Sequence, residues 1–480
     1  MTKPLNELTI TEAACALRAK ECTVRELWDA CAGAAKKSNP ELNAYIELFT
    51  ADEAAIAAAQ ARIDAEQVGG EVAPLLCGIP LAIKDNILIK GHVASAASKM
   101  LANYEAAYDA TVIEKLKEAG ALFLGRANMD EFAMGSSTEH SAYGPSRNPH
   151  DPARVPGGSS GGSASAVAAN MAIAALGTDT GGSIRQPAAH TGLVGLKPTY
   201  GAVSRYGSIA LGSSLDQIGP LAKSVADAKA LFNTLKGADK RDATSNPEGL
   251  FPTREHDGHL RIGVPRTFIE GVDADVKAVF EGTLAHLAAD GHTLVDIDLP
   301  TSKYALPVYY VIMPAEASTN LARYDGIRYG LAKRGATLLD DYIETKTEGF
   351  GPETQRRILL GTFVLSSGYI DAYYRKAEAA RNILRDEYAK AFESCDVVAF
   401  PTTPSPAFAF GEKSNDPVSM YLEDIFTVTA NLTGMPALSV PMGTAERDGS
   451  TLPIGIHFTA AHGDEEALFK IGAAVTGERL

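Results

Sequence analysis

The sequence contains little cysteine. Its 480 residues include five cysteines, Cys15, Cys22, Cys31, Cys77 and Cys395. Their number is odd and no two of them have the CxxC spacing, so neither a disulfide framework nor a zinc site is expected. The sequence therefore predicts no metal site in this chain.

Long apolar runs are also missing. A membrane-spanning helix needs about 20 consecutive apolar residues, and charged or polar side chains interrupt every apolar run well before that length. The one long uncharged stretch, residues 155–178, is built from Gly, Ser and Ala with an early Pro156, which is too weakly apolar for lipid. Residues 1–7 lack the apolar core of a signal peptide. We therefore expect a cytoplasmic protein without membrane contact.

Clusters of basic residues are absent as well. The chain has 44 Lys and Arg against 59 Asp and Glu, a net charge of −15. Phosphate neutralisation supplies most non-specific affinity for nucleic acid, so any polynucleotide would have to be held mainly by a partner. The sequence does have 45% hydrophobic residues over a length that can bury a large core, which excludes disorder as the main state.

The first 66 residues are expected to form helices around one short strand. Thr23 and Glu26, and then Thr50 and Glu53, have the three-residue spacing of a capping box. Helix starts are therefore predicted near residues 24 and 51. Between them, residues 43–49 alternate enough to predict a strand.

An α/β order follows along the chain. Residues 78–83 predict a buried strand that ends at Lys84. A helix is predicted over residues 111–119 and another strand over residues 121–125. Strand, helix and strand in this order are typical of an α/β fold.

The second half of the chain begins after its most polar connector. Residues 236–259 are rich in Asp, Pro, Gly and Arg, which predicts a boundary or a surface excursion. A mainly helical region is expected from about residue 315 to residue 392. Short apolar strands are predicted at 260–264, 397–400, 437–440 and 454–458.

The centre of the sequence is rich in glycine and poor in charge. Residues 157–219 hold 13 of the 44 glycines, where a uniform spread would give about six. From residue 155 to residue 200 the formally charged side chains are Asp179, Arg185 and Lys197, against roughly ten expected from the composition. An exposed linker is disfavoured because an Ala-rich helix is expected to follow over residues 163–175.

One nucleophile motif occurs in this centre and is rejected. Residues 158–162 satisfy the G-x-S-x-G pattern of the α/β-hydrolase elbow, and Asp424 and His457 would complete the order of a triad. The elbow needs a buried strand directly before it, whereas residues 144–156 contain four prolines. Nothing local supports Asp424 or His457 in such a triad.

The whole glycine-serine block resembles the amidase signature family. The matching segments are Gly157-Gly158-Ser159-Ser160-Gly161-Gly162-Ser163 and Gly177-Thr178-Asp179-Thr180-Gly181-Gly182-Ser183-Ile184-Arg185-Gln186-Pro187. The resemblance implies Ser183 as nucleophile, Ser159 as a cis-configured serine and Lys84 as the upstream lysine. The serines lie 24 positions apart and Lys84 lies 75 positions before Ser159, which are spacings that the family keeps.

The residue types are consistent with this chemistry. A serine hydroxyl needs a base, and His190, on a predicted helix face, is the nearest histidine. A lysine can serve as the base if burial disfavours its ammonium form, with Ser159 relaying the proton. Without the resemblance, a solvated Lys84 paired with Asp85 would be the favoured interpretation.

The loop before Ser183 is expected to bind the oxyanion. The predicted backbone donors are Thr180, Gly181, Gly182 and Ser183 itself, because glycines let N–H groups turn toward one point. Asp179 and Arg185 are expected to hold this loop through a buried charged network.

A second resemblance concerns the kind of amidase. Residues 128–137 and 316–330 are similar to the glutaminase subunits of tRNA-dependent amidotransferases. The resemblance implies that this chain hydrolyses glutamine and passes ammonia to a B-type subunit, which holds the tRNA and uses ATP and magnesium. A small C-type subunit would clasp the two. The acceptor would be glutamyl-tRNA(Gln), and in many organisms also aspartyl-tRNA(Asn).

The resemblance covers nearly the full chain and implies one compact amidase domain over residues 1–480. Its expected fold is α/β, with a central mixed twisted sheet covered by helices on both faces and no cofactor of its own. The expected parts are N-terminal helices (1–66), the signature core (75–235), the polar excursion (236–259) and a C-terminal half (260–480) that completes the sheet and the glutamine pocket.

Glutamine is a zwitterion, so its pocket needs a cation and an anion. The positions that match the family are Arg357 and Asp424, with Tyr309 lining the pocket, while the neighbouring Arg356 leaves the choice of arginine open. A stand-alone amidase would use the same triad without Arg357 and Asp424. A non-catalytic scaffold is a third interpretation, against which the intact triad argues.

Overall fold

The computed structural model describes residues 3–67, 69, 71–247, 249–252, 254, 256, 258–269, 271–413 and 416–479. Its strands are β1 (Tyr45–Leu48), β2 (Pro80–Lys84), β3 (Leu122–Ala127), β4 (Ala174–Asp179), β5 (Val194–Lys197), β6 (Gln217–Ala222), β7 (Arg261–Val264), β8 (Thr293–Asp296), β9 (Val397–Pro401), β10 (Ala437–Arg447) and β11 (Ser450–Ala460). Its α-helices are α1 (Ile10–Arg18), α2 (Val24–Leu42), α3 (Glu53–Gln67), α4 (Thr111–Glu118), α5 (Gly161–Ala168), α6 (Arg185–Thr191), α7 (Val225–Leu235), α8 (Ala274–Ala289), α9 (Ala305–Leu321), α10 (Leu338–Gly349), α11 (Pro352–Leu365), α12 (Arg375–Ser394), α13 (Pro417–Leu422), α14 (Val428–Thr433) and α15 (Glu465–Thr476).

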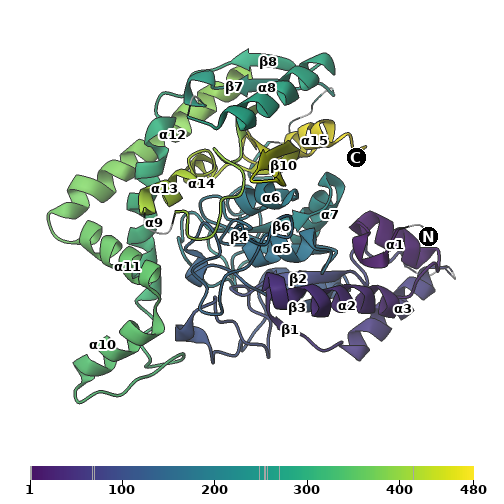
Figure 1. Cartoon of the computed structure of the whole chain (residues 1–480), viewed down its shortest axis with the longest axis horizontal. Coiled ribbons are helices and arrows are strands. Elements are labelled where there is room, and N and C mark those ends of the chain that lie inside the picture. Colours follow the sequence, from purple (N-terminus) through teal and green to yellow (C-terminus); the bar gives the residue numbers. More distant parts are fainter. Residues whose placement is uncertain are drawn as a thin grey trace.

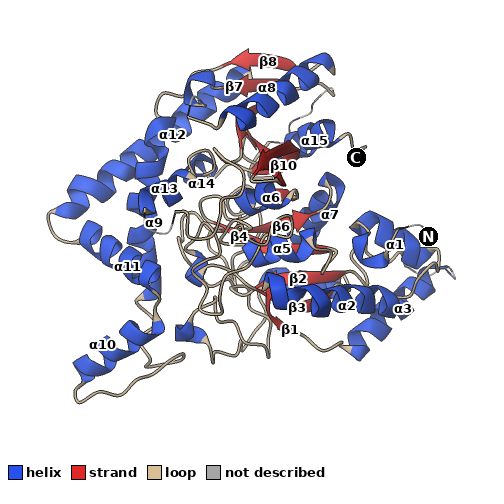
Figure 2. Cartoon of the chain, in the orientation of Figure 1, coloured by secondary structure: helices blue, strands red, loops and turns tan. Residues whose placement is uncertain are grey.

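One mixed sheet runs through the described part of the molecule (Figure 2). Its strand order is β1-β3-β2-β4-β6-β5-β10-β11-β9-β7-β8. The pairs β3–β2, β2–β4, β9–β7 and β7–β8 are parallel, and the remaining pairs are antiparallel. Every residue of β2, β4 and β6 is buried. Because successive side chains of a strand point to opposite faces, both faces of the sheet are covered there, which confirms the predicted α/β class.

Two groups of helices flank this sheet. α1, α2 and α3 lie beside the β1 end of the sheet, and α9 to α12 stand together on the opposite side of the molecule in Figure 1. Within the second group α11 and α12 both pack against α9. None of the described helices is long and apolar enough to cross a bilayer.

Most predicted elements are present, and two local predictions are wrong. Thr23 and Glu26 form the expected capping box of α2. At α3 the cap is Asp52 rather than Thr50, because the Asp52 carboxylate accepts a hydrogen bond from Ala55 N (3.0 Å). The Ala-rich helix expected over residues 163–175 ends at Ala168 as α5, and its last two residues open strand β4. Pairing with β2 and β6 in a buried sheet outweighs the helix propensity of alanine.

The helical region of the second half begins at Ala305, ten residues earlier than expected, and is interrupted by a π-helical turn at Ile370–Tyr374. The polar connector 236–259 contains no helix or strand at its described positions. Residues 248, 253, 255 and 257 of that connector lie outside the described residues.

The sheet brings the two parts of the predicted site together. Lys84 is the last residue of β2, and its neighbour in the ladder, Ala127, is the last residue of β3. On the other side of β2, strand β4 ends at Asp179, directly before the loop that carries Ser183. The carboxyl ends of these parallel strands therefore meet at one edge of the sheet. The loop before α5 and the first residues of α5 lie at this same edge.

The two helix caps give a test of local stability. Replacing Thr23 or Asp52 by alanine removes a side-chain acceptor from a helix start, so each change is expected to lower the free energy of unfolding by about 1 kcal/mol in urea denaturation. Thr50→Ala is the matched control, because its side chain caps nothing in the described chain, and it should stay within about 0.5 kcal/mol of wild type. A loss at Thr50 equal to that at Asp52 would contradict this assignment of the cap.

Candidate active site

Lys84 lies at the centre of the site with its side chain fully buried. Its Nζ is 2.8 Å from Ser159 Oγ, from Ser160 Oγ and from Thr178 Oγ1. Burial in this hydroxyl shell lowers the pKa of Lys84 to about 7, although Asp130, Asp179 and Asp216 act in the opposite direction. A substantial part of the amine is therefore neutral near pH 7 and can accept a proton.

The interpretation of Lys84 as a solvated partner of Asp85 is wrong. Asp85 is buried and pairs with Arg126, whose Nη1 lies 2.6 Å from Asp85 Oδ1. It also accepts a hydrogen bond from Ala97 N (3.0 Å). The Asp85 carboxylate is thus satisfied by other groups, and the contacts of the Lys84 amine are hydroxyl and carbonyl oxygens.

The hydrogen bonds around Lys84 orient its lone pair. Ser160 Oγ donates its one proton to Thr178 O (3.2 Å), so toward Lys84 it can only accept. Thr178 O, 3.3 Å from Nζ, is also an acceptor. If the two N–H bonds of a neutral amine are donated to these two oxygens, its one lone pair is left to accept from the hydroxyl of Ser159 or from that of Thr178.

Ser159 follows a glycine that no other residue could replace. A Cβ on Gly158 would lie 2.2 Å from Asp130 Oδ2 and 2.7 Å from Ser137 N, distances that the packed interior cannot accommodate. The Gly158–Ser159 peptide bond is cis. The Ser159 loop is held next to Ser183 by a backbone hydrogen bond from Ser160 N to Ser183 O (3.1 Å). A direct hydrogen bond between the Ser159 and Ser183 hydroxyls is not present among the described contacts.

The predicted oxyanion loop differs from expectation at one donor. Gly182 N donates to Asp179 Oδ1 (2.9 Å), so its N–H points at this carboxylate. Gly182 lies at φ +143°, and a Cβ there would be 2.3 Å from Thr427 Oγ1. The N–H groups of Thr180, Gly181 and Ser183 make no hydrogen bond to another described residue. In this conformation the backbone donors of these three residues, and not that of Gly182, are free to face a substrate.

Asp179 and Arg185 form the buried charged network that was predicted. Arg185 Nε and Nη2 donate to the two oxygens of Asp179 at 3.0 and 2.9 Å, and neither side chain is exposed to solvent. Burial alone would raise the pKa of Asp179, but the Arg185 guanidinium and its hydrogen bonds hold that pKa below its ordinary value. Arg185 also donates to Thr427 O (2.9 Å) and to Asn431 Oδ1 (2.7 Å). The pair therefore ties the serine loop to α14 and to the segment before it.

The two neighbouring arginines differ in burial. Arg357 on α11 is buried, and its guanidinium lies over the rings of Tyr310 and Tyr421, 5.5 and 5.3 Å from their centroids. Its Nε donates to Glu353 Oε1 at 2.7 Å. Arg356 points outward, with about half of its side chain exposed. The structure thus turns Arg357, and not Arg356, toward the interior.

Asp424 and Tyr309 lie on the same side of the site. Asp424 accepts a hydrogen bond from Ser136 Oγ (2.7 Å), and Tyr310 Oη lies 3.5 Å from the same carboxylate oxygen. Burial raises the pKa of Asp424 to about 7, opposed by Ser136 and Arg357. Tyr309 lies against the serine loop, because a Cβ on Gly181 would be 2.7 Å from its ring. The ring of Tyr310 lies next to all three predicted residues, because it is 5.1 Å from the ring of Tyr309 and under the Arg357 guanidinium, with its Oη near Asp424.

Several residues of this region were not found from the sequence. They are Ser160 and Thr178 beside Lys84, Ser136 and Tyr310 beside Asp424, and Glu353 and Tyr421 beside Arg357. Two of them carry a signal that could have been used. Ser160 adjoins Ser159 in the glycine-serine block, and Glu353 stands four residues before Arg357 on one helix, where ion pairs form.

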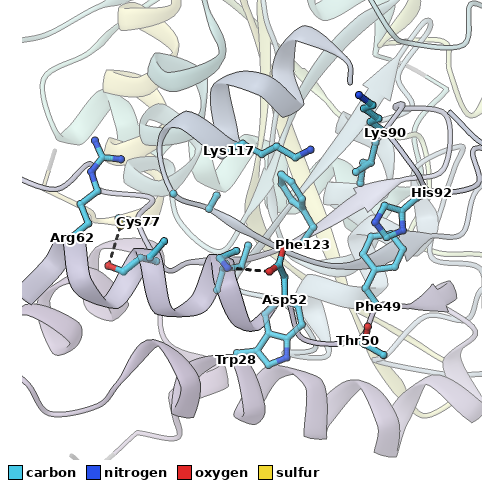
Figure 3. Close-up of a pocket in the computed structure, with 17 residues that line it drawn as sticks. Trp28, Phe49, Thr50, Asp52, Arg62, Cys77, Lys90, His92, Lys117 and Phe123 are labelled. Carbon is cyan, nitrogen blue, oxygen red and sulfur yellow. Dashed lines mark hydrogen bonds between the residues drawn. The ribbon is translucent and has the colours of Figure 1, made fainter. Parts of the chain in front are cut away.

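A separate cavity of about 480 Å³ lies beside β3, α2 and α3 (Figure 3). Its lining includes the rings of Trp28, Phe49 and Phe123 and the amines of Lys90 and Lys117, and none of the predicted site residues. The cavity reaches Leu122 at the start of β3, whereas Lys84 is level with Ala127 at its end. These positions are roughly 16 Å apart along the strand. The described residues include no cluster of three or more His, Cys, Asp or Glu that could hold a metal ion.

Comparison with known proteins identifies the family of this arrangement. A sequence model of the family described as Amidase matches residues 26–469. The chain belongs to the amidase family. Its relative in Desulfatibacillum aliphaticivorans, named as the A subunit of glutamyl-tRNA(Gln) amidotransferase, is 49% identical over 474 residues, which is 98% of this chain and 96% of the relative.

Solved structures of the amidase family have the same fold. The A subunit of glutamyl-tRNA(Gln) amidotransferase from Thermotoga maritima is similar with a TM-score of 0.80 and 41% identity, over 98% of this chain and 94% of that one. The peptide amidase from Stenotrophomonas maltophilia is similar with a TM-score of 0.80 and 29% identity, over 99% and 98% of the two chains. One amidase fold over the chain agrees with both, and it confirms the resemblance to the amidase family.

The shifted pKa of Lys84 can be measured directly. In protein with ¹³C-labelled lysine side chains, the Cε signal of Lys84 should titrate near pH 7, more than three units below an ordinary lysine, because its ammonium form is desolvated. Lys197 is fully buried too, and its pKa is also lowered to about 7, so the signal is assigned by its loss in Lys84→Met. If the signal lost in this variant titrates near pH 10, the amine is not a neutral base in the folded enzyme.

Proposed function

We propose that this amidase is the glutaminase subunit of a tRNA-dependent amidotransferase. The observation that carries the proposal is a buried arginine, Arg357, and a buried aspartate, Asp424, on the side of the site that adjoins the Ser183 loop. A cation and an anion beside a serine nucleophile suit an amide whose other end carries both a carboxylate and an ammonium group, as glutamine does. The relatives named as A subunits of glutamyl-tRNA(Gln) amidotransferase, which this chain matches over 98% of its length, support the same assignment.

Glutamine binds with its two charged α-groups held apart from the reacting amide. The Arg357 guanidinium takes the α-carboxylate, and the Asp424 carboxylate takes the α-ammonium group, while Tyr309 lines the pocket between them and Ser183. Before glutamine binds, Asp424 accepts its hydrogen bond from Ser136 and has a pKa of about 7. The incoming ammonium group favours the ionised carboxylate, so substrate itself restores the charge that burial disfavours.

Hydrolysis proceeds through an ester of Ser183. Ser183 Oγ attacks the side-chain amide carbon while its proton passes to Ser159, and the proton of Ser159 passes to Lys84. Backbone N–H groups of Thr180 and Gly181 stabilise the oxyanion that forms. Lys84 then returns a proton through Ser159 to the leaving nitrogen, and ammonia departs as the C–N bond breaks. Water attacks the ester by the same proton path, which releases glutamate and restores Ser183.

The rest of the reaction belongs to partner subunits in the cytoplasm. A B-type subunit holds glutamyl-tRNA(Gln), activates its carboxylate with ATP and magnesium and receives the ammonia, and a small C-type subunit joins the two. The net charge of −15 supports this division, because a chain that does not hold the tRNA needs no cationic surface. The cofactors are therefore assigned to the partner, and this chain supplies side chains and backbone donors alone.

The nucleophile is tested in the assembled enzyme. Ser183→Ala should abolish glutamine-dependent amidation and leave ammonium-dependent amidation near the wild-type rate, since only the release of ammonia needs Ser183. Both rates are measured as amidated tRNA on the same preparation. Loss of both activities in a correctly assembled complex would remove Ser183 from this role.

We call Arg357 and Asp424 the glutamine clamp, and we test their role by substitution with the neighbouring Arg356 as control. Arg357→Ala should lower kcat/KM for glutamine by about 10²-fold or more, the scale of a lost charge-assisted contact. Asp424→Ala should do the same. Arg356→Ala is the matched control, because the Arg356 side chain is about half exposed, and it should change kcat/KM less than about threefold.

A neutral amide without α-groups separates this function from a stand-alone amidase. The stand-alone enzyme would hydrolyse such an amide as well as glutamine and would tolerate both clamp substitutions. If wild type gives glutamine no advantage over the neutral amide, the glutaminase assignment is wrong even where Ser183 is the nucleophile.

A further inference from the structure

The cavity beside β3, α2 and α3 has the size of a ligand pocket (Figure 3). Its volume of about 480 Å³ falls within the range of about 300–1,000 Å³ that small-molecule pockets have. Protein interiors otherwise pack as densely as organic crystals and leave few voids larger than a water molecule. No residue that the glutaminase mechanism uses lines this cavity. It is therefore a candidate binding site of its own.

Small side chains keep the cavity open. Helix α3 lines it with Ala55, Ala58 and Ala59, which have the i, i+3 and i+4 spacing of one helix face. Gly120 and Ala121 line it from the connection that leads into β3. A large side chain at one of the α3 positions would occupy part of the space. The cavity can thus be closed by substitution without any change in the sheet.

The inner wall of the cavity is apolar and aromatic. Trp28 and Cys77 are 4 and 2% exposed, and the rings of Phe49 and Phe123 are partly buried beside them. The His92 ring lies against Phe49 with the centroids 4.0 Å apart. Burial lowers the pKa of His92, so this ring is largely neutral at pH 7. Such walls suit a flat ring, which can stack on aromatic faces or meet their edges.

The mouth of the cavity carries positive charge. Lys90 and Lys117 are exposed, and Figure 3 shows their side chains across the cavity from Trp28, with Arg62 to one side. Asp52 is the single acidic residue of the lining. Three cations and one anion give the lining a formal charge of +2, in a chain whose net charge is −15. A local charge opposite to that of the whole chain favours an anionic ligand at this place.

The two amines at the mouth remain available to an anion. Among the described residues, Lys90 Nζ has no hydrogen bond and no ion pair, and only the Lys90 backbone N–H donates to Asp109. Lys117 Nζ lies 2.7 Å from Asp109, but about half of its side chain is exposed, and such surface pairs hold a lysine weakly. Asp52 is occupied by the N–H of Ala55, which it caps (3.0 Å).

We propose that this cavity binds an aromatic acid, a small molecule of one to three rings that carries a carboxylate, sulfonate or phosphate group. Its rings lie among Trp28, Phe49 and Phe123. Its acidic group lies at the mouth, where Lys90 and Lys117 donate charge-assisted hydrogen bonds to it. The inference does not rest on the proposed function, because the cavity shares no residue with the glutaminase site.

Two fluorescent probes test the acidic group. They are 8-anilinonaphthalene-1-sulfonate and N-phenyl-1-naphthylamine, which has the same rings without the sulfonate, and titration of the full chain gives a Kd for each. Lys90→Met with Lys117→Met should raise Kd for the sulfonate by about tenfold and change Kd for the neutral probe less than about twofold. Lys277→Met with Lys376→Met is the matched control, because these exposed lysines of α8 and α12 lie outside the lining. It should leave both values unchanged.

Two adjacent alanines of α3 localise the binding. Ala57 and Ala58 are both exposed, but only Ala58 lines the cavity. Ala58→Phe should raise Kd for both probes by about tenfold or more, because its ring fills the space, whereas Ala57→Phe should stay within about twofold of wild type. The chain has one tryptophan, so a ¹⁵N spectrum contains one indole N–H signal. The sulfonate probe should shift this Trp28 signal in wild type and in Ala57→Phe, and not in Ala58→Phe.

The Trp28 signal of wild type keeps the test valid if Ala58→Phe unfolds, which its Tm would reveal. An unmoved signal in wild type at a probe concentration well above Kd would overturn the inference. Equal effects of Ala57→Phe and Ala58→Phe on Kd, or an equal loss of both probes in the Lys90 and Lys117 variant, would overturn it as well. None of these measurements involves glutamine or a companion subunit. Failure here therefore leaves the proposed function untouched, and failure of the proposed function leaves this site untouched.

Discussion

The site depends on a lysine amine buried without a carboxylate in contact with it. Moving an ammonium group out of water is so costly that proteins normally pair it or leave it exposed. Here the contacts of Lys84 Nζ are hydroxyl and carbonyl oxygens of Ser159, Ser160 and Thr178. Such a shell can stabilise a neutral amine but only weakly repays the burial of a charge. It has to be assembled from the ends of β2 and β4 and from the loop before α5, which is why the sheet order matters to the chemistry.

The buried charge of Arg185 is stabilised in the opposite way, by a carboxylate in contact with it. Arg185 is always protonated, so its burial requires an anion, and Asp179 supplies one with two-point geometry. Asp179 then also accepts from Gly182 N and from Ile184 N. The carboxylate thereby shapes the loop that carries Ser183 while leaving Lys84 unpaired. Pairing fixes the charge of Arg185, and the absence of a paired carboxylate favours the neutral form of the neighbouring Lys84 amine.

The sequence predicted the catalytic side chains of the site better than the hydrogen bonds around them. The spacing of Lys84, Ser159 and Ser183 is a property of the chain, and two of these three side chains are in direct contact in the structure. The direction of a single N–H cannot be predicted from composition. The Gly182 N–H was therefore expected to face the substrate, whereas it donates a hydrogen bond to Asp179. The cap of α3 was misplaced for a similar reason, because Thr50 and Asp52 both have capping side chains and only backbone geometry decides between them. Alanines 174 and 175 were assigned to a helix because propensity ignores the strands on either side.

Helix α11 has a packed inner side and an exposed outer side, and this limits how the helix can change in length. Its inner residues Thr354, Arg357 and Gly361 recur at helical spacing, and its outer residues Leu359 and Phe363 are four positions apart. Inserting one residue into the first turn would rotate everything beyond it by about 100° relative to α9. Gly361 would then leave its close approach to Pro314 and Leu360 would take its place, while Arg356 would turn toward the space that Arg357 occupies. Insertions in the family should therefore accumulate in the connections before and after α11, and the helix itself should keep its number of residues even where its outer side chains vary.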